Sequence, residues 1–404
     1  GITTPAAGAT TTVLDTLTIT AGHFLDNGAM TLDLAGSGTV FVENGAFLEG
    51  TGTVRYSGLT PNILRTAYNN LVIDTESGLS VTASAPAIGL QVLGNLTVGA
   101  LGTSTLDLNT TDPLTAVGEN VYIGTLGSIE ASDTSDLNVF GDWDNDGTFV
   151  ANGGLVEFLQ ATGTVSVAAG NSPFADVFVG GNSDYTFVES ATSTGYLTLG
   201  ASSFVLQNGE TLAVGGTFTN SMGAFDTTWT NTTLRLYSGT AYTVNSKLTG
   251  DTYNVIDVAA GTHPRFWNSD AATYSTEPGG SIYSMDHGEV VGDLNIYGDF
   301  VSSSYDDYWS YETDFDGAAL GAPRVANVQI EDNGSVLYTG GSLTSLGSST
   351  ATTTISALGA GPYDLTLGGT STVDMNYYSV REIVAGGLVL TGSPTITDIS
   401  FGDF

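Results

Sequence analysis

Short runs of alternating apolar and polar residues, each followed by glycine or asparagine, constrain the fold of this chain more than any other feature. Thr39–Val42 and Thr105–Leu108 are examples, and similar runs continue along the chain. A period of two with β-branched residues predicts strands that bury one face, and the glycine and asparagine between them predict turns. Apolar residues do not recur at the spacing of a helix face over any long stretch. The sequence therefore predicts an all-β protein.

Three sequence markers recur in the same order, which predicts tandem repeats. The clearest marker is Gly-x-Leu-x-apolar, and the other two each contain an aromatic residue. Copies of the clearest marker begin at Gly94, Gly195, Gly292 and Gly386, at intervals of roughly 97 residues. The predicted organisation is a partial N-terminal repeat over 1–53, repeats over 54–155, 156–233 and 234–335, and a partial C-terminal repeat over 336–404.

Two architectures fit a repeat of this length. One is a parallel β-solenoid in which each repeat winds several coils, and the other is a string of β-sandwich domains. The strands are very short, glycine or asparagine follows almost every one, and no linker separates the repeats. These features favour the solenoid, with tandem β-sandwich domains as the alternative.

The first and last repeats are incomplete. Thr16–Ile19 matches only the later part of a repeat, and the chain stops soon after Leu388–Leu390. A solenoid without caps exposes strand edges that template association. The pattern is consistent with a fragment of a longer chain, or with head-to-tail association of half-repeats into a fibre.

The charge balance excludes several classes of protein. The chain of 404 residues has 42 Asp and Glu against 7 Lys and Arg, a net charge of −35, and no cysteine. A nucleic-acid interface needs clustered cations, so nucleic acid is not an expected partner. Disulfides, thiol catalysis and cysteine-bound zinc are excluded. No apolar stretch approaches the ~20 residues of a membrane-spanning helix, so membrane insertion is not expected, and Gly1–Pro5 does not resemble a signal peptide.

One acidic motif has the spacing of a calcium loop. Asp142, Asp144 and Asp146 alternate with other residues before Gly147, and carboxylate oxygens are the ligands that Ca²⁺ prefers. A complete EF-hand loop needs Glu at its twelfth position, where this chain has Gly153. The alternative is an ordinary repeat turn. Calcium is the one cofactor that the sequence brings into consideration.

A segment rich in aromatic and acidic residues lies at 262–316, within the repeat 234–335. Aromatic rings stack on sugars, and paired carboxylates catalyse glycoside hydrolysis. The alternative is that the aromatic residues pack on the solenoid and the acidic residues solvate a loop. The candidate glycan-binding residues are Trp267, Tyr305, Asp306, Asp307 and Trp309.

The region from Leu234 onward carries a resemblance to a known group of proteins. Its runs Leu236–Asn245, Gly292–Phe300 and Asp307–Tyr311, with the ending Gly392–Phe404, resemble the large β-strand-repeat surface proteins of ultrasmall candidate-phyla bacteria. The resemblance covers roughly residues 234–404 and is looser upstream. It implies a solenoid architecture and an extracellular or cell-surface location, and it transfers no catalytic residue.

We therefore expect a non-enzymatic extracellular structural protein, a rod-like surface or filament subunit that associates with copies of itself through open repeat ends. The alternative is an adhesin, or a glycan-binding or carbohydrate-active β-helix, that uses the 262–316 region on cell-surface glycans.

Overall fold

The computed structural model describes most of the first half of the chain and a series of segments in the second half. The described residues are 7–76, 78–222, 226–237, 241–246, 252–258, 263–271, 289–296, 299–302, 306–308, 326–330, 335–338, 342–346, 352–357, 360–400 and 402–403. They form two compact units, Gly1–Ser193 and Thr194–Phe404. The secondary structure of the described residues is entirely β, and no helix among them is long and apolar enough to cross a membrane.

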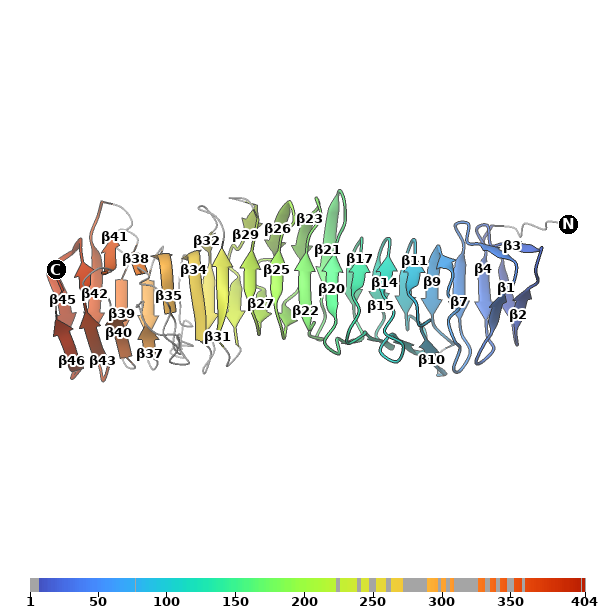
Figure 1. Cartoon of the computed structure of the whole chain (residues 1–404), viewed down its shortest axis with the longest axis horizontal. Coiled ribbons are helices and arrows are strands. Elements are labelled where there is room, and N and C mark those ends of the chain that lie inside the picture. Colours follow the sequence, from blue (N-terminus) through green and yellow to red (C-terminus); the bar gives the residue numbers. More distant parts are fainter. Residues whose placement is uncertain are drawn as a thin grey trace. The chain divides into compact units, whose positions relative to one another are not determined.

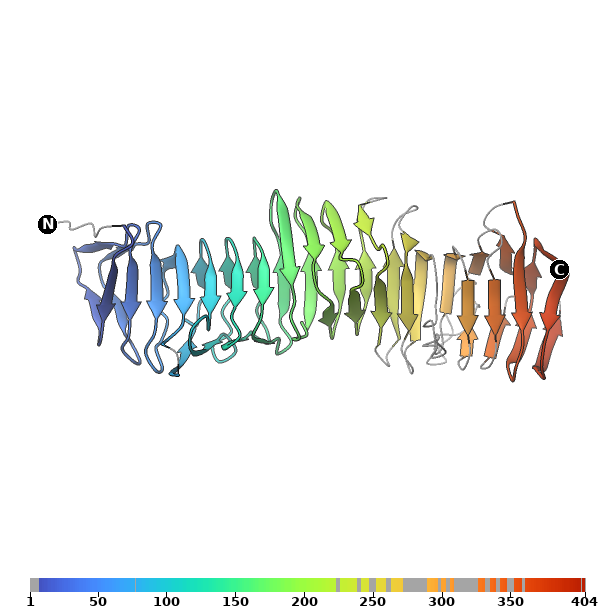
Figure 2. The ribbon, with the colours of Figure 1, turned by 180° about the vertical axis from the view of Figure 1, so that it is seen from behind.

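The first unit is a parallel β-solenoid with three main sheets. Sheet 1 has the order β1 (Thr10–Val13), β4 (Thr31–Leu34), β7 (Thr53–Tyr56), β9 (Asn70–Ile73), β12 (Leu96–Val98), β15 (Val121–Ile123), β18 (Trp143–Asn145), β21 (Thr164–Ala168) and β23 (Asp184–Phe187). Sheet 2 has the order β8 (Ala67–Tyr68), β11 (Leu90–Val92), β14 (Thr115–Val117), β17 (Leu137–Val139), β20 (Leu155–Phe158) and β22 (Asp176–Val179). Sheet 3 has the order β10 (Ser80–Ser84), β13 (Thr103–Asp107), β16 (Gly127–Glu130) and β19 (Thr148–Val150). Two small sheets pair β2 (Leu17–Ile19) with β5 (Phe41–Glu43) and β3 (Phe24–Asp26) with β6 (Ala46–Leu48), and β24 (Ala191–Ser193) is the last strand of the unit. In Figure 1, β4, β7 and β9 stand side by side, and in Figure 2 the same blue strands point in one direction.

The second unit is also built from parallel strands. One sheet contains β27 (Thr211–Val214), β30 (Thr233–Leu236) and β33 (Val255–Val258), and another contains β36 (Asp299–Ser302), β39 (Ser335–Tyr338), β42 (Tyr363–Leu367) and β45 (Ile383–Leu390). β26 (Ser203–Leu206) pairs with β29 (Thr227–Thr228). The remaining strands form one branched sheet of β25 (Leu197–Leu199), β28 (Phe218–Asn220), β31 (Ala241–Ser246), β32 (Thr252–Tyr253), β34 (His263–Ala271), β35 (Glu289–Ile296), β37 (Asp306–Tyr308), β38 (Ala326–Ile330), β40 (Ser342–Leu346), β41 (Thr353–Ala357), β43 (Thr372–Asn376), β44 (Tyr378–Val380) and β46 (Thr395–Ser400).

Backbone pairing shows that the repeating unit in space is a single coil. In sheet 1, Leu96 pairs with Val121, which pairs in turn with Trp143, so each strand lies beside the strand one coil later. Coil length varies along the same sheet, because Thr53 pairs with Asn70, 17 residues on, and Leu71 with Leu96, 25 residues on. The difference in length is taken up by the corners between strands.

The core lies inside the coils and follows the alternation in the sequence. Most strands have every second side chain buried, as in β9 and β27. In the first unit the core includes an aromatic cluster centred on Trp143, whose ring centroid lies 5.0 Å from Phe149 and 5.5 Å from Phe174. Aromatic pairs at such distances add stabilisation beyond the area that they bury.

The prediction of an all-β parallel solenoid is confirmed, and the alternative of tandem β-sandwiches is wrong, because the described strands pair in parallel and sandwiches are antiparallel. The boundaries of the roughly 97-residue repeats stay a prediction. Within the second unit, the marker that begins at Gly195 leads into β25 and the one at Gly386 lies in β45, which belong to different sheets. The marker therefore identifies individual strands, and the structural repeat is the single coil.

Candidate functional site

The acidic motif at 142–146 lies on the outer face of sheet 1, around β18. Trp143 and Asn145 point into the core and are buried, whereas Asp142, Asp144 and Asp146 are exposed. The three carboxylates therefore follow the outer edge of an extended strand. Side chains two residues apart on such a strand are separated by about 7 Å. In an EF-hand, by contrast, the loop curls around the ion.

Asp142 ends a ladder of amide side chains that runs along successive coils. The Asn95 backbone N–H donates to Oδ1 of Asn70 (3.1 Å), and the Asn120 N–H donates to Oδ1 of Asn95 (3.2 Å). The Asn120 Nδ2 also donates to Oδ1 of Asn95, at 2.9 Å. The Asp142 N–H then donates to Oδ1 of Asn120 at 2.8 Å, and Asp142 Oδ1 accepts from the N–H of Ser166 at 2.8 Å. One carboxylate oxygen of Asp142 therefore already has a structural partner.

Asp144 lies among other acidic groups on this face. Partial burial, followed by repulsion from Asp146, Glu189 and Asp142, raises the pKa of its carboxyl above the usual value. A shallow hollow of about 430 Å³ lies beside it and is lined by Tyr122, Asp144 and small residues such as Ala168. In the described residues no group of three or more His, Asp or Glu side chains is close enough together to hold a metal ion. Calcium binding by Asp142, Asp144 and Asp146 stays a prediction.

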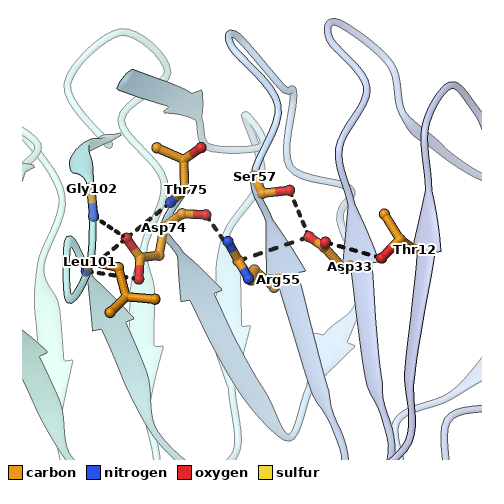
Figure 3. Close-up of polar contacts among 8 residues, drawn as sticks. All are labelled: Thr12, Asp33, Arg55, Ser57, Asp74, Thr75, Leu101 and Gly102. Atoms are coloured by element: carbon orange, nitrogen blue, oxygen red, sulfur yellow. Dashed lines mark hydrogen bonds and ion pairs between the residues drawn. The ribbon is translucent and has the colours of Figure 1, made fainter. Parts of the chain in front are cut away.

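A second polar network lies on sheet 1 and at the corner that follows it (Figure 3). The Asp74 side chain is buried and accepts hydrogen bonds from the backbone N–H groups of Thr75 (2.9 Å), Leu101 (3.1 Å) and Gly102 (3.0 Å). A carboxylate that accepts several backbone hydrogen bonds is held strongly in place. Asp74 therefore fixes the corner between β12 and β13 to the end of β9.

Arg55 extends the same network toward the start of the unit. Its Nε donates to the backbone carbonyl of Asp74 at 3.1 Å and lies 3.9 Å from Oδ1 of Asp33. Asp33 also accepts from the hydroxyls of Ser57 (2.6 Å) and Thr12 (3.4 Å), so four coils are joined by side chains (Figure 3). Each group here has a partner within the fold, which indicates a structural role.

The structure describes only part of the candidate glycan-binding region. The backbone of Trp267 lies in β34, and the backbones of Asp306 and Asp307 lie in β37. Both strands pair with β35, so these three residues belong to neighbouring strands of one sheet. Tyr305 and Trp309 lie outside the described residues. Glycan binding by this region stays a prediction.

Sequence reasoning missed the amide ladder and the buried carboxylate. The ladder had a readable signal, since Asn70, Asn95 and Asn120 each precede Leu or Val at intervals of 25 residues. Asp74 had none, because its partners lie at the next corner, 27 and 28 residues on, and are backbone groups.

Comparisons of the chain with known protein families, curated proteins and solved structures find no match.

Proposed function

We propose that this chain is a non-enzymatic structural element of the cell surface or extracellular space that associates head-to-tail with further copies. The observation that supports this most strongly is the exposure of apolar side chains on the last coil of the second unit. The proposed location rests on the resemblance of residues 234–404 to bacterial surface proteins, and the charge of −35 would keep such a chain soluble.

The last coil differs from the one before it at matched positions. Leu367 in β42 is 0% exposed, and its register partner Leu390 in β45 is 49% exposed. Val373 in β43 is 0% exposed, and its partner Ile396 in β46 is 41% exposed. The inner residues are covered because another coil follows. A further coil stacked on β45 and β46 would remove Leu390 and Ile396 from water, at about 25 cal/mol for each Å² of apolar surface.

The first coil of a second copy is the proposed covering surface. Its strands β1 to β3 offer parallel edges. The inward-facing Val13 and Leu25 are half-buried there, whereas their register partners Leu34 and Phe47, one coil later, are buried. Stacking one copy on the next in this way is a heterologous contact, which repeats without closing and yields a filament.

Two substitutions at the last coil test the proposal. Leu390→Asp with Ile396→Asp should abolish filaments in electron micrographs and species larger than a dimer in sedimentation velocity. The matched control is Leu126→Asp, which changes a leucine of similar exposure (47%) in the first unit and should leave association unchanged. A wild-type chain that stays monomeric at all concentrations, or a double variant that still forms filaments, would contradict the proposal.

The second candidate function is glycan binding or hydrolysis at 262–316. It is favoured by the pairing of β34 and β37 with β35, which brings the backbones of Trp267, Asp306 and Asp307 into one sheet. A glycan screen with Trp267→Ala and Trp309→Ala tests binding. Glycoside turnover that is lost in Asp306→Asn or Asp307→Asn would refute the non-enzymatic proposal.

A further inference from the structure

The outer face of sheet 2 carries a row of four residues with opposite charges at its two ends and a hollow beside a projecting leucine between them. Gly89, Leu114 and Asp136 each directly precede residues that pair in register, namely Leu90, Thr115 and Leu137. Arg65 stands two residues before Ala67, as Gly89 stands two before Gln91, the register partner of Ala67. The row therefore follows neighbouring coils at the starts of β8, β11, β14 and β17. It consists of Arg65, Gly89, Leu114 and Asp136, and we call it the Arg65–Asp136 row.

The gap at Gly89 is a real hollow. It has a volume of about 370 Å³ and is walled by Arg65, Ile88 and Leu114. Its floor includes the small residues Ala67 and Ala116. The Leu114 side chain beside it projects into solvent, with 55% of its surface exposed. A hollow and a projecting side chain thus lie on adjacent strands, about 5 Å apart.

The two charged ends of the row lack partners. Among the described residues, neither the Arg65 guanidinium nor the Asp136 carboxylate has a hydrogen-bond or ion-pair partner within the chain. An unpaired arginine is notable here because the chain has only 7 cations against 42 acidic residues. The row is also flanked by apolar surface, since Ile88 is 70% and Leu93 is 42% exposed.

These features fit a second copy of the same chain. A two-fold axis that runs along the strands, between β11 and β14, reverses the order of the coils in the partner. Each position of the row then faces the mirror position: Arg65 faces Asp136, and Leu114 faces the hollow at Gly89, in both directions. Such a self-complementary patch is what an isologous two-fold interface requires.

We propose that this chain forms a lateral two-fold dimer through the outer face of sheet 2, with the Arg65–Asp136 row at its centre. Two sheets packed face to face stand about 10 Å apart, a separation at which side chains from both faces interdigitate. The row spans three strand spacings, about 14 Å, so the central contact is small and the dimer is weak. The contact lies in the first unit and does not depend on the end-to-end association proposed above.

Charge exchange tests the pairing. In the Leu390→Asp, Ile396→Asp chain, which lacks the proposed end contact, sedimentation equilibrium should show monomer and dimer. Adding Arg65→Glu or Asp136→Arg alone should weaken this dimer at least about tenfold. The double variant Arg65→Glu with Asp136→Arg should restore it, because each new charge faces its complement. The matched control Asp133→Arg makes the same change of charge on an exposed residue outside the row and should leave the dimer intact. A monomeric starting chain, or a double variant no better than the single ones, would overturn the proposal.

A second measurement does not depend on charge. Because the chain has no cysteine, Ala116→Cys places a single thiol beside the axis, and a short bismaleimide should link two copies in high yield. Ser128→Cys places the thiol on the outer face of sheet 3 and should give little product. Equal yields from both would refute the interface. Introducing Leu390→Asp with Ile396→Asp into the Ala116→Cys chain removes the proposed end contact, and cross-linking should persist.

Discussion

Two of the three side chains of β18 face the core and one faces outward, and the two faces differ in what surrounds them. Trp143 and Asn145 are buried, and the Trp143 ring packs against Phe149 and Phe174 at 5.0 and 5.5 Å. Asp144 between them lies on the outer face, and its partial desolvation, followed by repulsion from nearby acidic groups, raises its pKa. The inward-facing side chains must fit the space inside the coil, whereas the outward-facing positions accept a wide choice of polar and charged residues. Stability is therefore concentrated inside the coils.

The largest effect is expected from removing the indole of the core. Trp143→Ala should lower the free energy of unfolding by about 4 kcal/mol, because the packed neighbours cannot close the cavity. Trp143→Phe should cost less, because its ring fills part of the cavity. Both substitutions remove an Nε1–H that is buried without a partner among the described residues. Urea unfolding followed by circular dichroism measures both. Asp144→Ala on the same strand is the control, and a loss comparable to that of Trp143→Ala would invalidate the contrast between inner and outer rows.

The buried carboxylate of Asp74 extends the comparison, because a polar side chain here should contribute as much to stability as an apolar core residue. Asp74→Ala should cost about 3 kcal/mol, since three backbone N–H groups lose their acceptor. Asp74→Asn keeps one acceptor and should cost less. The exposed Asp133→Ala should have almost no effect on the urea midpoint. Equal midpoints for Asp74→Ala and Asp133→Ala would show that the network of Figure 3 contributes no stability.

Alkaline pH should lower the stability of the protein through a buried pair of tyrosines in the core. The hydroxyls of Tyr56 and Tyr68 are buried 2.9 Å apart, and burial raises the pKa of Tyr56 to about 12 and that of Tyr68 well above its usual value. The unfolded state loses these protons near pH 10, so stability is complete below pH 10 and falls as the pH rises through about 12. Thermal unfolding between pH 8 and 12 measures the fall.

The double variant Tyr56→Phe with Tyr68→Phe is the control for this pH dependence. It should be less stable at pH 8, since the Leu64 N–H loses its bond to the Tyr56 hydroxyl, but its stability should fall less steeply above pH 10. An unchanged pH profile would assign the alkaline loss to other groups.

The outer amide ladder should contribute less than the core. Asn95→Ala removes the Nδ2 bonds to Asn70 and Glu119 and the Oδ1 acceptor used by Asn120. It should cost about 1 kcal/mol, because water replaces part of the lost bonding. Asn62, whose side chain is exposed, gives the matched change Asn62→Ala. If the urea midpoints of Asn95→Ala and Asn62→Ala are equal within error, the ladder does not stabilise the protein.

The smallest effect is expected at Asp144, and its sign is opposite. Asp144→Asn relieves repulsion from Asp146 and Asp142 and should stabilise the chain by roughly 0.5 kcal/mol at neutral pH and low salt. A calcium titration of both proteins also tests the proposed metal ligands. Saturable stabilisation of the wild type that is lost in Asp144→Asn supports a site at Asp142–Asp146, and equal responses contradict it.

The sequence predicted the solenoid because its information is local. Alternation inside strands and glycine at corners are visible within a few residues, so both the strand content and the short turns could be predicted. Interactions between coils depend on register, which no local pattern specifies. The Arg55–Asp33 contact joins residues 22 positions apart, and the Asp142–Asp146 run resembles a loop until Trp143 is seen to be buried. For the candidate glycan residues, the structure adds the strand positions of Trp267, Asp306 and Asp307.

The pairing of each strand with the one a coil later has a consequence for how the chain acquires its structure. Partners such as Leu96 and Val121 are 25 residues apart, so no coil has to wait for a distant part of the sequence. Proteins dominated by such near contacts close smaller loops and fold faster than sandwiches with long-range pairing. Each coil finds its template in the coil already formed, so ordering can proceed in one direction as the polypeptide emerges from the ribosome.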